Sequence, residues 1–99
     1  MEFEILWSPE ALDDLRSLTN FIAVDNPAAA EKVGSALITS TELLATQPLL
    51  GRRVPEQQST NIREVIRAPY RIIYEVRRSR RTVEVLRIWH GARGTPEIS

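Results

Sequence analysis

The chain has 99 residues, of which 42% are hydrophobic, and its 13 basic and 13 acidic residues give a formal net charge of zero. This length allows one small domain, over residues 1–99, with a single core. The absence of cysteine excludes a disulfide framework and a thiolate metal site, and one histidine cannot build a histidine-rich metal site. We therefore expect no bound metal and no cofactor.

Membrane insertion and export are not indicated. The longest apolar runs are far shorter than the roughly 20 residues that a membrane-spanning helix needs. The first residues, Met-Glu-Phe-Glu, are acidic and lack the apolar centre of a signal peptide. Together with the absence of cysteine, this predicts a cytoplasmic protein.

The neutral total hides a strong charge asymmetry. Residues 1–50 contain eight acidic and two basic residues, a net charge of −6, and residues 51–99 contain eleven arginines and five glutamates, a net charge of +6. All basic residues except Lys32 are arginine, whose planar guanidinium suits carboxylates and phosphates. The basic half either pairs with the acidic half or presents a surface for an anionic partner.

The N-terminal half predicts one strand and two helices. Residues 2–7 alternate between apolar and acidic or polar side chains, which indicates a half-buried strand. Ser8 can cap a helix that has Pro9 at its first position. Apolar residues at helical spacing continue this helix, which we expect to end before Asp25. A second start signal, Asn-Pro, then predicts a helix over 27–46, antiparallel to the first.

The C-terminal half predicts three strands. Residues 47–61 contain two prolines, a glycine and a polar run, so we expect a loop without regular structure. Short runs over 62–67, 70–77 and 82–90 mix apolar and charged residues and are separated by turn sequences, as in an antiparallel meander. Residues 94–99 resemble a frayed tail.

Side-chain alternation divides the last two strands into faces. In the strand over 70–77, strict alternation predicts one mostly apolar face of Tyr70, Ile72, Tyr74 and Val76, opposite Arg71, Ile73, Glu75 and Arg77. In the strand over 82–90, it groups Val83, Val85, Arg87 and Trp89 against Glu84, Leu86, Ile88 and His90. Because neither face of the last strand is fully polar, we expect this strand to be central.

The predicted order is strand, helix, helix, strand, strand, strand. This is an α+β fold in which an antiparallel helix hairpin packs on one face of a mostly antiparallel sheet. The other face is expected to be free and to carry arginines.

Candidate chemistry is limited to arginines and His90. No phosphate-binding glycine loop or nucleophile elbow is present. Arginines could stabilise the charge on a phosphodiester that is being cleaved, and His90 could transfer a proton. That combination would be a metal-independent ribonuclease. The alternative is that His90 is an ordinary strand-end side chain and that the arginines are solvated.

Several motifs in order resemble the RelE/ParE superfamily of toxins from bacterial type II toxin–antitoxin systems. They are Ser-Pro-Glu-Ala at 8–11, Asn-Pro at 26–27, Val-Pro-Glu at 54–56, Tyr-Arg-Ile-Ile-Tyr-Glu-Val at 70–76 and Val-Leu-Arg-Ile-Trp-His-Gly-Ala-Arg at 85–93. The resemblance covers nearly the whole chain and is closer to the ParE branch.

The resemblance implies two alternative activities. ParE-like toxins act on DNA gyrase, and RelE-like toxins cleave mRNA on the ribosome. Arg71 and Arg93 match two arginines of the RelE-like basic cluster, but that cluster has no clear lysine counterpart here. Glu97 is the only titratable side chain after Arg93. We therefore favour a plasmid-stabilisation type toxin that inhibits DNA gyrase without catalysis of its own, over an mRNA interferase or an inactive antitoxin-binding module.

The resemblance also implies a cognate antitoxin as partner. Such antitoxins carry a DNA-binding domain and an acidic segment that folds on the toxin, so we expect a toxin–antitoxin hetero-oligomer, and a toxin homodimer is a further option. The candidate residues for contacts with antitoxin or target are Arg63, Arg67, Arg71, Arg77, Arg87 and Arg93.

Overall fold

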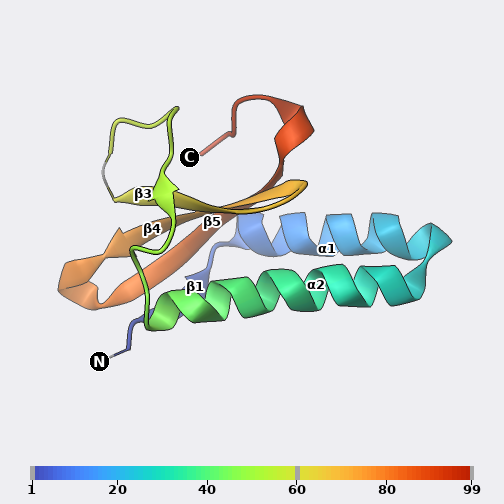
Figure 1. Cartoon of the computed structure of the whole chain (residues 1–99), viewed down its shortest axis with the longest axis horizontal. Coiled ribbons are helices and arrows are strands. Elements are labelled where there is room, and N and C mark those ends of the chain that lie inside the picture. The colour runs from blue at the N-terminus through green and yellow to red at the C-terminus, as the bar shows by residue number, and fades with distance from the viewer. Residues whose placement is uncertain (1, 60, 99) are drawn as a thin grey trace.

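A computed structural model describes residues 2–59 and 61–98. It consists of a five-stranded sheet and two antiparallel helices that cover one of its faces (Figure 1). The elements are β1 Glu4–Trp7, α1 Pro9–Asp25, α2 Pro27–Glu42, β2 Arg52–Arg53, β3 Ile62–Arg67, β4 Tyr70–Arg77 and β5 Thr82–His90, with 3-10 turns at Leu43–Ala45, Arg78–Arg80 and Gly91–Arg93. The predicted α+β fold and element order are confirmed.

The sheet has the order β1-β5-β4-β3-β2. The pairs β2–β3, β3–β4 and β4–β5 are antiparallel. The edge strand β1 is parallel to β5. The last strand is therefore internal, as predicted. It has β1 on one side and β4 on the other.

Both helices begin where the capping residues predict. The Ser8 hydroxyl accepts a hydrogen bond from the Ala11 amide, and the Asn26 side chain accepts one from the Ala29 amide. The second helix ends at Glu42 and continues as a 3-10 turn to Ala45, so the α-helix is shorter than predicted. The first strand begins at Glu4, two residues later than predicted.

The main core lies between the sheet and the helices. Tyr70, Ile72, Tyr74 and Val76 of β4 all face it, which confirms the predicted face of this strand. A second, smaller cluster of Val54, Ile73 and Trp89 lies on the face turned away from the helices, called here the outer face. The loop before β3 and the tail after β5 pass over this face (Figure 1). The outer face is therefore only partly free.

The prediction of strict side-chain alternation in β5 is wrong, because this strand contains a β-bulge. Ile73 pairs with Arg87 and Tyr74 pairs with Val85, so Leu86 has no partner in β4. The extra residue shifts the alternation by one position. Ile88 consequently joins Val85 in the main core, whereas Leu86 and Trp89 pack in the outer cluster.

Two segments predicted to be irregular are ordered. Residues 47–61 contain the short strand β2, whose Arg52 pairs with Glu64 of β3. The tail is not frayed through residue 98, because the Trp89 indole donates a hydrogen bond to the Gly94 carbonyl and Ile98 packs against the outer cluster. Contacts distant in sequence order both segments. The last residue, 99, lies outside the described part.

Candidate functional site

Glu64 is the centre of a charged network on the outer face. Its side chain is fully buried, and its two carboxylate oxygens accept hydrogen bonds from the Nε atoms of Arg52, at 2.7 Å, and Arg71, at 2.5 Å. Arg52 lies directly opposite Glu64 across the β2–β3 ladder. Because each buried carboxylate oxygen has a charged donor, the cost of burying Glu64 is offset.

Arg71 is held by a second carboxylate from the loop before β3. Its Nη1 and Nη2 donate hydrogen bonds to Glu56 at 3.2 and 2.8 Å, and its side chain is 13% exposed. The hydrogen bond with Glu56 is the largest cause of the raised pKa of Arg71, and it lowers the pKa of Glu56 below its usual 4.5. The pair therefore stabilises the fold above pH 4.5, and this contribution is lost as the pH falls through the lowered pKa.

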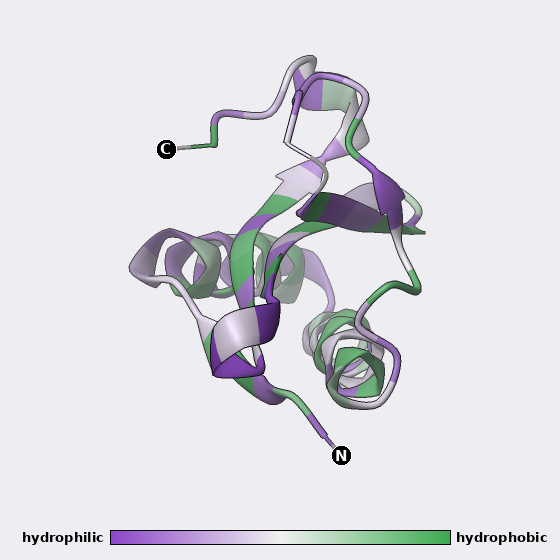
Figure 2. Ribbon diagram, turned by 90° about the vertical axis from the view of Figure 1, so that its left-hand side faces the viewer, coloured by the Kyte–Doolittle hydropathy of each residue, from purple (hydrophilic) through white to green (hydrophobic). Residues whose placement is uncertain are grey.

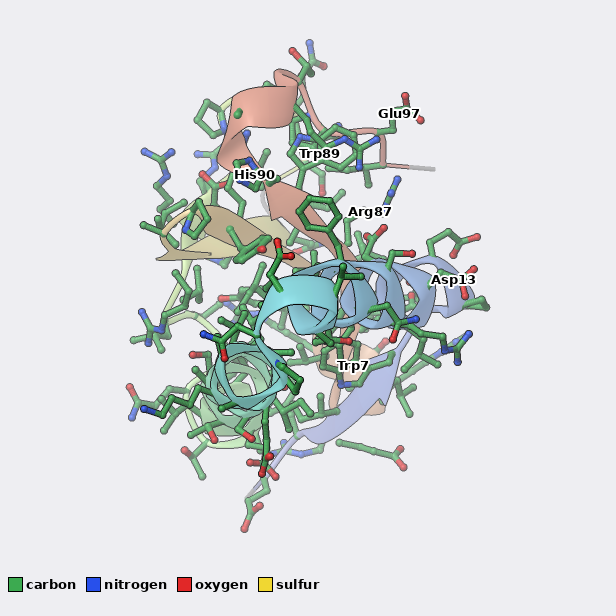
Figure 3. All side chains as sticks on the ribbon, turned by 90° about the vertical axis from the view of Figure 1, so that its right-hand side faces the viewer. Trp7, Asp13, Arg87, Trp89, His90 and Glu97 are labelled. Carbon is green, nitrogen blue, oxygen red and sulfur yellow. The ribbon has the colours of Figure 1, made fainter. Side chains whose placement is uncertain are left out.

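Trp89 is a neighbour of both Arg71 and Arg93. Arg71 lies opposite Trp89 in the β4–β5 register, and the guanidinium carbon of Arg93 is 4.1 Å from the centre of the indole ring. Arg87 also lies over this ring, at 5.0 Å (Figure 3). A cation over an aromatic face is attracted by the ring quadrupole. Trp89 therefore contacts the guanidiniums of Arg87 and Arg93, two of the candidate arginines. The sequence did not predict Trp89 as part of the site.

His90 lies apart from Arg71, although it lines a shallow hollow together with Arg93. It lies opposite Tyr70, a residue of the helix-facing side of β4, and contacts this ring edge-to-face at 5.4 Å. Figure 3 shows Trp89 and His90 on different sides of the β5 ribbon. The His90 Nδ1 accepts a hydrogen bond from the Ala92 amide. Of the three residues of the ribonuclease hypothesis, Arg71 and His90 therefore lie on opposite faces of the sheet. Arg93 follows the end of β5, where it lies over Trp89 and also lines the hollow that contains His90.

The carboxylates of Glu64 and Glu56, which bind Arg71, are poorly suited to act as a catalytic base. Glu64 is buried between two arginines, and the pKa of Glu56 is lowered by Arg71. A lower pKa makes a carboxylate a weaker base. The site can hold an anionic group next to Arg71 and Arg93, but it supplies no well-placed proton acceptor among the side chains that the structure describes.

The remaining candidate arginines point in several directions. Arg77 donates to Glu75 and Glu84 on the outer face, at 2.9 Å to each from Nη2. Arg87 forms a two-pronged ion pair with Asp14 of α1, at 2.7 and 2.9 Å.

Arg63 and Arg67 lie on the helix-facing side of β3. Arg63 donates to the Gly51 carbonyl, and Arg67 donates to the Ser40 hydroxyl of α2. Their role as partner contacts, like that of the other candidates, stays a prediction, and the structure shows that they do not form one surface. A partner carboxylate would have to replace or extend hydrogen bonds that the arginines already make.

The described residues contain neither a candidate metal-binding cluster nor a candidate membrane-spanning helix. Residues 2–59 and 61–98 contain no group of three His, Cys, Asp or Glu side chains that could hold a metal ion. No helix in this same part of the chain is long and apolar enough to cross a membrane.

Comparison with solved structures supports the fold. The protein superposes on a chain of the chromosomal ParDE toxin–antitoxin system from P. aeruginosa with a TM-score of 0.72. The two sequences are 20% identical, and the superposition covers 90% of this chain and 96% of that one. The protein also superposes on a chain of the RelBE2 toxin–antitoxin complex from Mycobacterium tuberculosis with a TM-score of 0.69, at 21% identity, covering 91% and 99%. At this level of identity the likeness concerns the fold alone.

Sequence comparison identifies the family. The model of the ParE toxin of type II toxin–antitoxin systems matches residues 5–94. The toxin RelE2 of Caulobacter vibrioides is 33% identical over 91 residues, which cover 91% of this chain and 97% of that protein. The chain therefore belongs to the ParE toxin family of type II toxin–antitoxin systems, within the RelE/ParE superfamily.

Proposed function

We propose that this chain inhibits DNA gyrase and is neutralised by a cognate antitoxin in the cytoplasm, acting as a single domain. The family match over residues 5–94 is the observation that carries this proposal. The geometry supports it, because the described carboxylates beside Arg71 are already bound by arginines and His90 lies on the opposite face of the sheet from Arg71. Inhibition of another enzyme requires a binding surface and no catalytic base.

The antitoxin part of the proposal rests on charge and on the relatives. Two structural neighbours come from toxin–antitoxin systems. The basic C-terminal half offers guanidinium groups to an acidic segment, and the ion pair of Arg71 with Glu56 shows that a carboxylate fits there. We expect the antitoxin to form a hetero-oligomer with this chain, and co-purification with the product of an adjacent small gene tests this.

A ribosome-dependent mRNA interferase is the second candidate. It is favoured by the shared neighbour of Arg71 and Arg93, since Trp89 lies opposite Arg71 in the sheet and under the guanidinium of Arg93. Two guanidiniums in this region could stabilise the charge on a phosphodiester. The related toxin RelE2 carries the name of that branch.

Two assays on the purified chain separate the candidates. We expect it to inhibit DNA supercoiling by gyrase, with activity restored by antitoxin, and to leave mRNA on programmed ribosomes uncut. Cleaved mRNA with normal supercoiling would contradict the gyrase proposal. In that case Arg71→Ala and Arg93→Ala should each abolish cleavage, with Lys32→Ala as a control for the loss of one charge. Inactivity in both assays, with growth unaffected in cells that express the chain alone, would indicate an antitoxin-binding module.

A further inference from the structure

Most basic side chains in this protein already have partners, but two neighbouring arginines do not. The side chains of Arg78 and Arg80 form no hydrogen bond, ion pair or ring contact with any other described residue, and the same is true of the side chains of Lys32 and Arg53. Lys32 lies on α2, and Arg53 lies on β2, opposite Arg63 of β3. Arg78 and Arg80 lie in one exposed turn, so their charges add.

This turn forms the tip of the β4–β5 hairpin. It is a 3-10 turn over Arg78–Arg80, followed by Arg81 in the left-handed region with φ 51°. The nearby carboxylates, Glu75 and Glu84, are both bound by Arg77. Residues 75–84 of the hairpin contain four arginines and two glutamates, so this segment has a formal net charge of +2.

A hollow of about 360 Å³ lies beside the tip. Its walls are formed by Asn61, Ser79 and the arginines at 77, 78 and 80, together with Glu75 and Val76. Guanidinium, amide and hydroxyl groups can all donate hydrogen bonds to phosphate oxygens. Val76 is the only apolar residue among those that line the hollow.

We propose that the β4–β5 hairpin tip binds the phosphate backbone of a nucleic acid through Arg78 and Arg80. A protein partner is less favoured because the cores of protein interfaces are depleted in charged residues, whereas six of the seven residues that line the hollow are polar or charged. The strongly exposed apolar residues Phe21 and Val24 lie near the end of α1, at the opposite end of the molecule (Figure 1). Figure 2 views the tip end directly and shows the turn as hydrophilic. This surface is separate from Arg71 and Arg93 and does not depend on which target the toxin has.

Fluorescence anisotropy with a short labelled DNA duplex tests the proposal over a range of salt concentrations. Arg78→Ala/Arg80→Ala should reduce the slope of log K against log salt by about 2, because each lost phosphate contact removes about 0.9 from it. The affinity advantage of the wild type over this variant should shrink about tenfold as the salt rises from about 50 to about 200 mM, because two contacts contribute a slope of about 1.8.

The matched control is Lys32→Ala/Arg53→Ala, which removes two unpaired cations elsewhere and changes the net charge equally. Its binding should stay within about twofold of the wild type, and Arg78→Lys/Arg80→Lys should keep most of the salt dependence, since lysine also contacts phosphates. Equal losses in the two alanine variants would overturn the proposal by showing that only net charge matters. A polyglutamate peptide that binds the tip as tightly as the duplex does would also overturn it, in favour of an acidic protein partner.

Discussion

At the residue scale, Glu64 shows how a charged side chain can be essential to this fold. In the sequence it is one of five glutamates in an arginine-rich half and has no feature that marks it. In the structure it is 1% exposed and receives the guanidiniums of Arg52 and Arg71. Predicting this would have required the β2–β3 register, and β2 was not predicted at all.

Replacement of Glu64 by alanine should strongly destabilise the protein. The change leaves the mostly buried Arg71 without its inner partner, and breaking a buried ion pair on one side costs about 3 to 5 kcal/mol. Urea unfolding followed by circular dichroism measures this loss. Asp13→Ala is the control, because its pair with Arg16 is exposed and should contribute less than about 1 kcal/mol. Similar losses of unfolding free energy in the two variants would show that the buried ion pairs of Glu64 contribute no more to stability than an exposed pair does.

At the element scale, the bulge in β5 connects the sheet to the start of α1. The Ser8 amide donates a hydrogen bond to the Val85 carbonyl, and the Ser8 hydroxyl donates one to the carbonyl of Leu86, the bulged residue. The same hydroxyl caps the helix by accepting from Ala11. Ser8 therefore fixes the position of α1 relative to β5. The sequence identified the cap but not the bulge.

Ser8→Ala should consequently cost more than the loss of an ordinary helix cap. It removes the cap and leaves the Leu86 carbonyl without its hydroxyl donor, so we expect a loss of about 2 kcal/mol in the free energy of unfolding. Asn26→Ala removes only the exposed cap of α2 and should cost about 1 kcal/mol or less. Thermal melts of both variants provide the comparison, and a smaller loss for Ser8→Ala than for Asn26→Ala would contradict the bridging role.

At the scale of the whole molecule, the acidic and basic halves are joined by Asp14 and Arg87. The two side chains are 13% and 17% exposed, and Asp14 also accepts a hydrogen bond from the Ile88 amide. The hydrogen bond with Asp14 is the largest cause of the raised pKa of Arg87. Part of the basic half thus pairs with the acidic half inside the fold, which was one of the two alternatives that the charge asymmetry left open.

A double-mutant cycle tests this connection. Asp14→Ala and Arg87→Ala should each destabilise by about 3 kcal/mol, since each leaves a mostly buried charge unpaired. The double variant should lose less than the sum, by at least about 1 kcal/mol, because the two residues are in contact. Urea unfolding of all four proteins gives the coupling. Additive losses would mean that the ion pair contributes nothing beyond each residue's own packing.

The sequence by itself determined the element order, the helix starts and the core face of β4. These depend on local signals: capping residues, prolines at first helical positions, and side-chain periodicity. The motifs from Ser8 to Arg93 also sufficed for the family resemblance, which the family model confirmed. Such features need no knowledge of which segments meet.

Only the tertiary structure decided how the charged residues are used. The register of β2, β3, β4 and β5, with the bulge at Leu86, places Arg71 at Trp89, buries Glu64 between arginines and puts His90 on the other face. It also leaves Arg78 and Arg80 without described partners at the hairpin tip. The physical reason is that an ion pair depends on distances between strands, and a shift of one residue in register moves a side chain to the opposite face of the sheet.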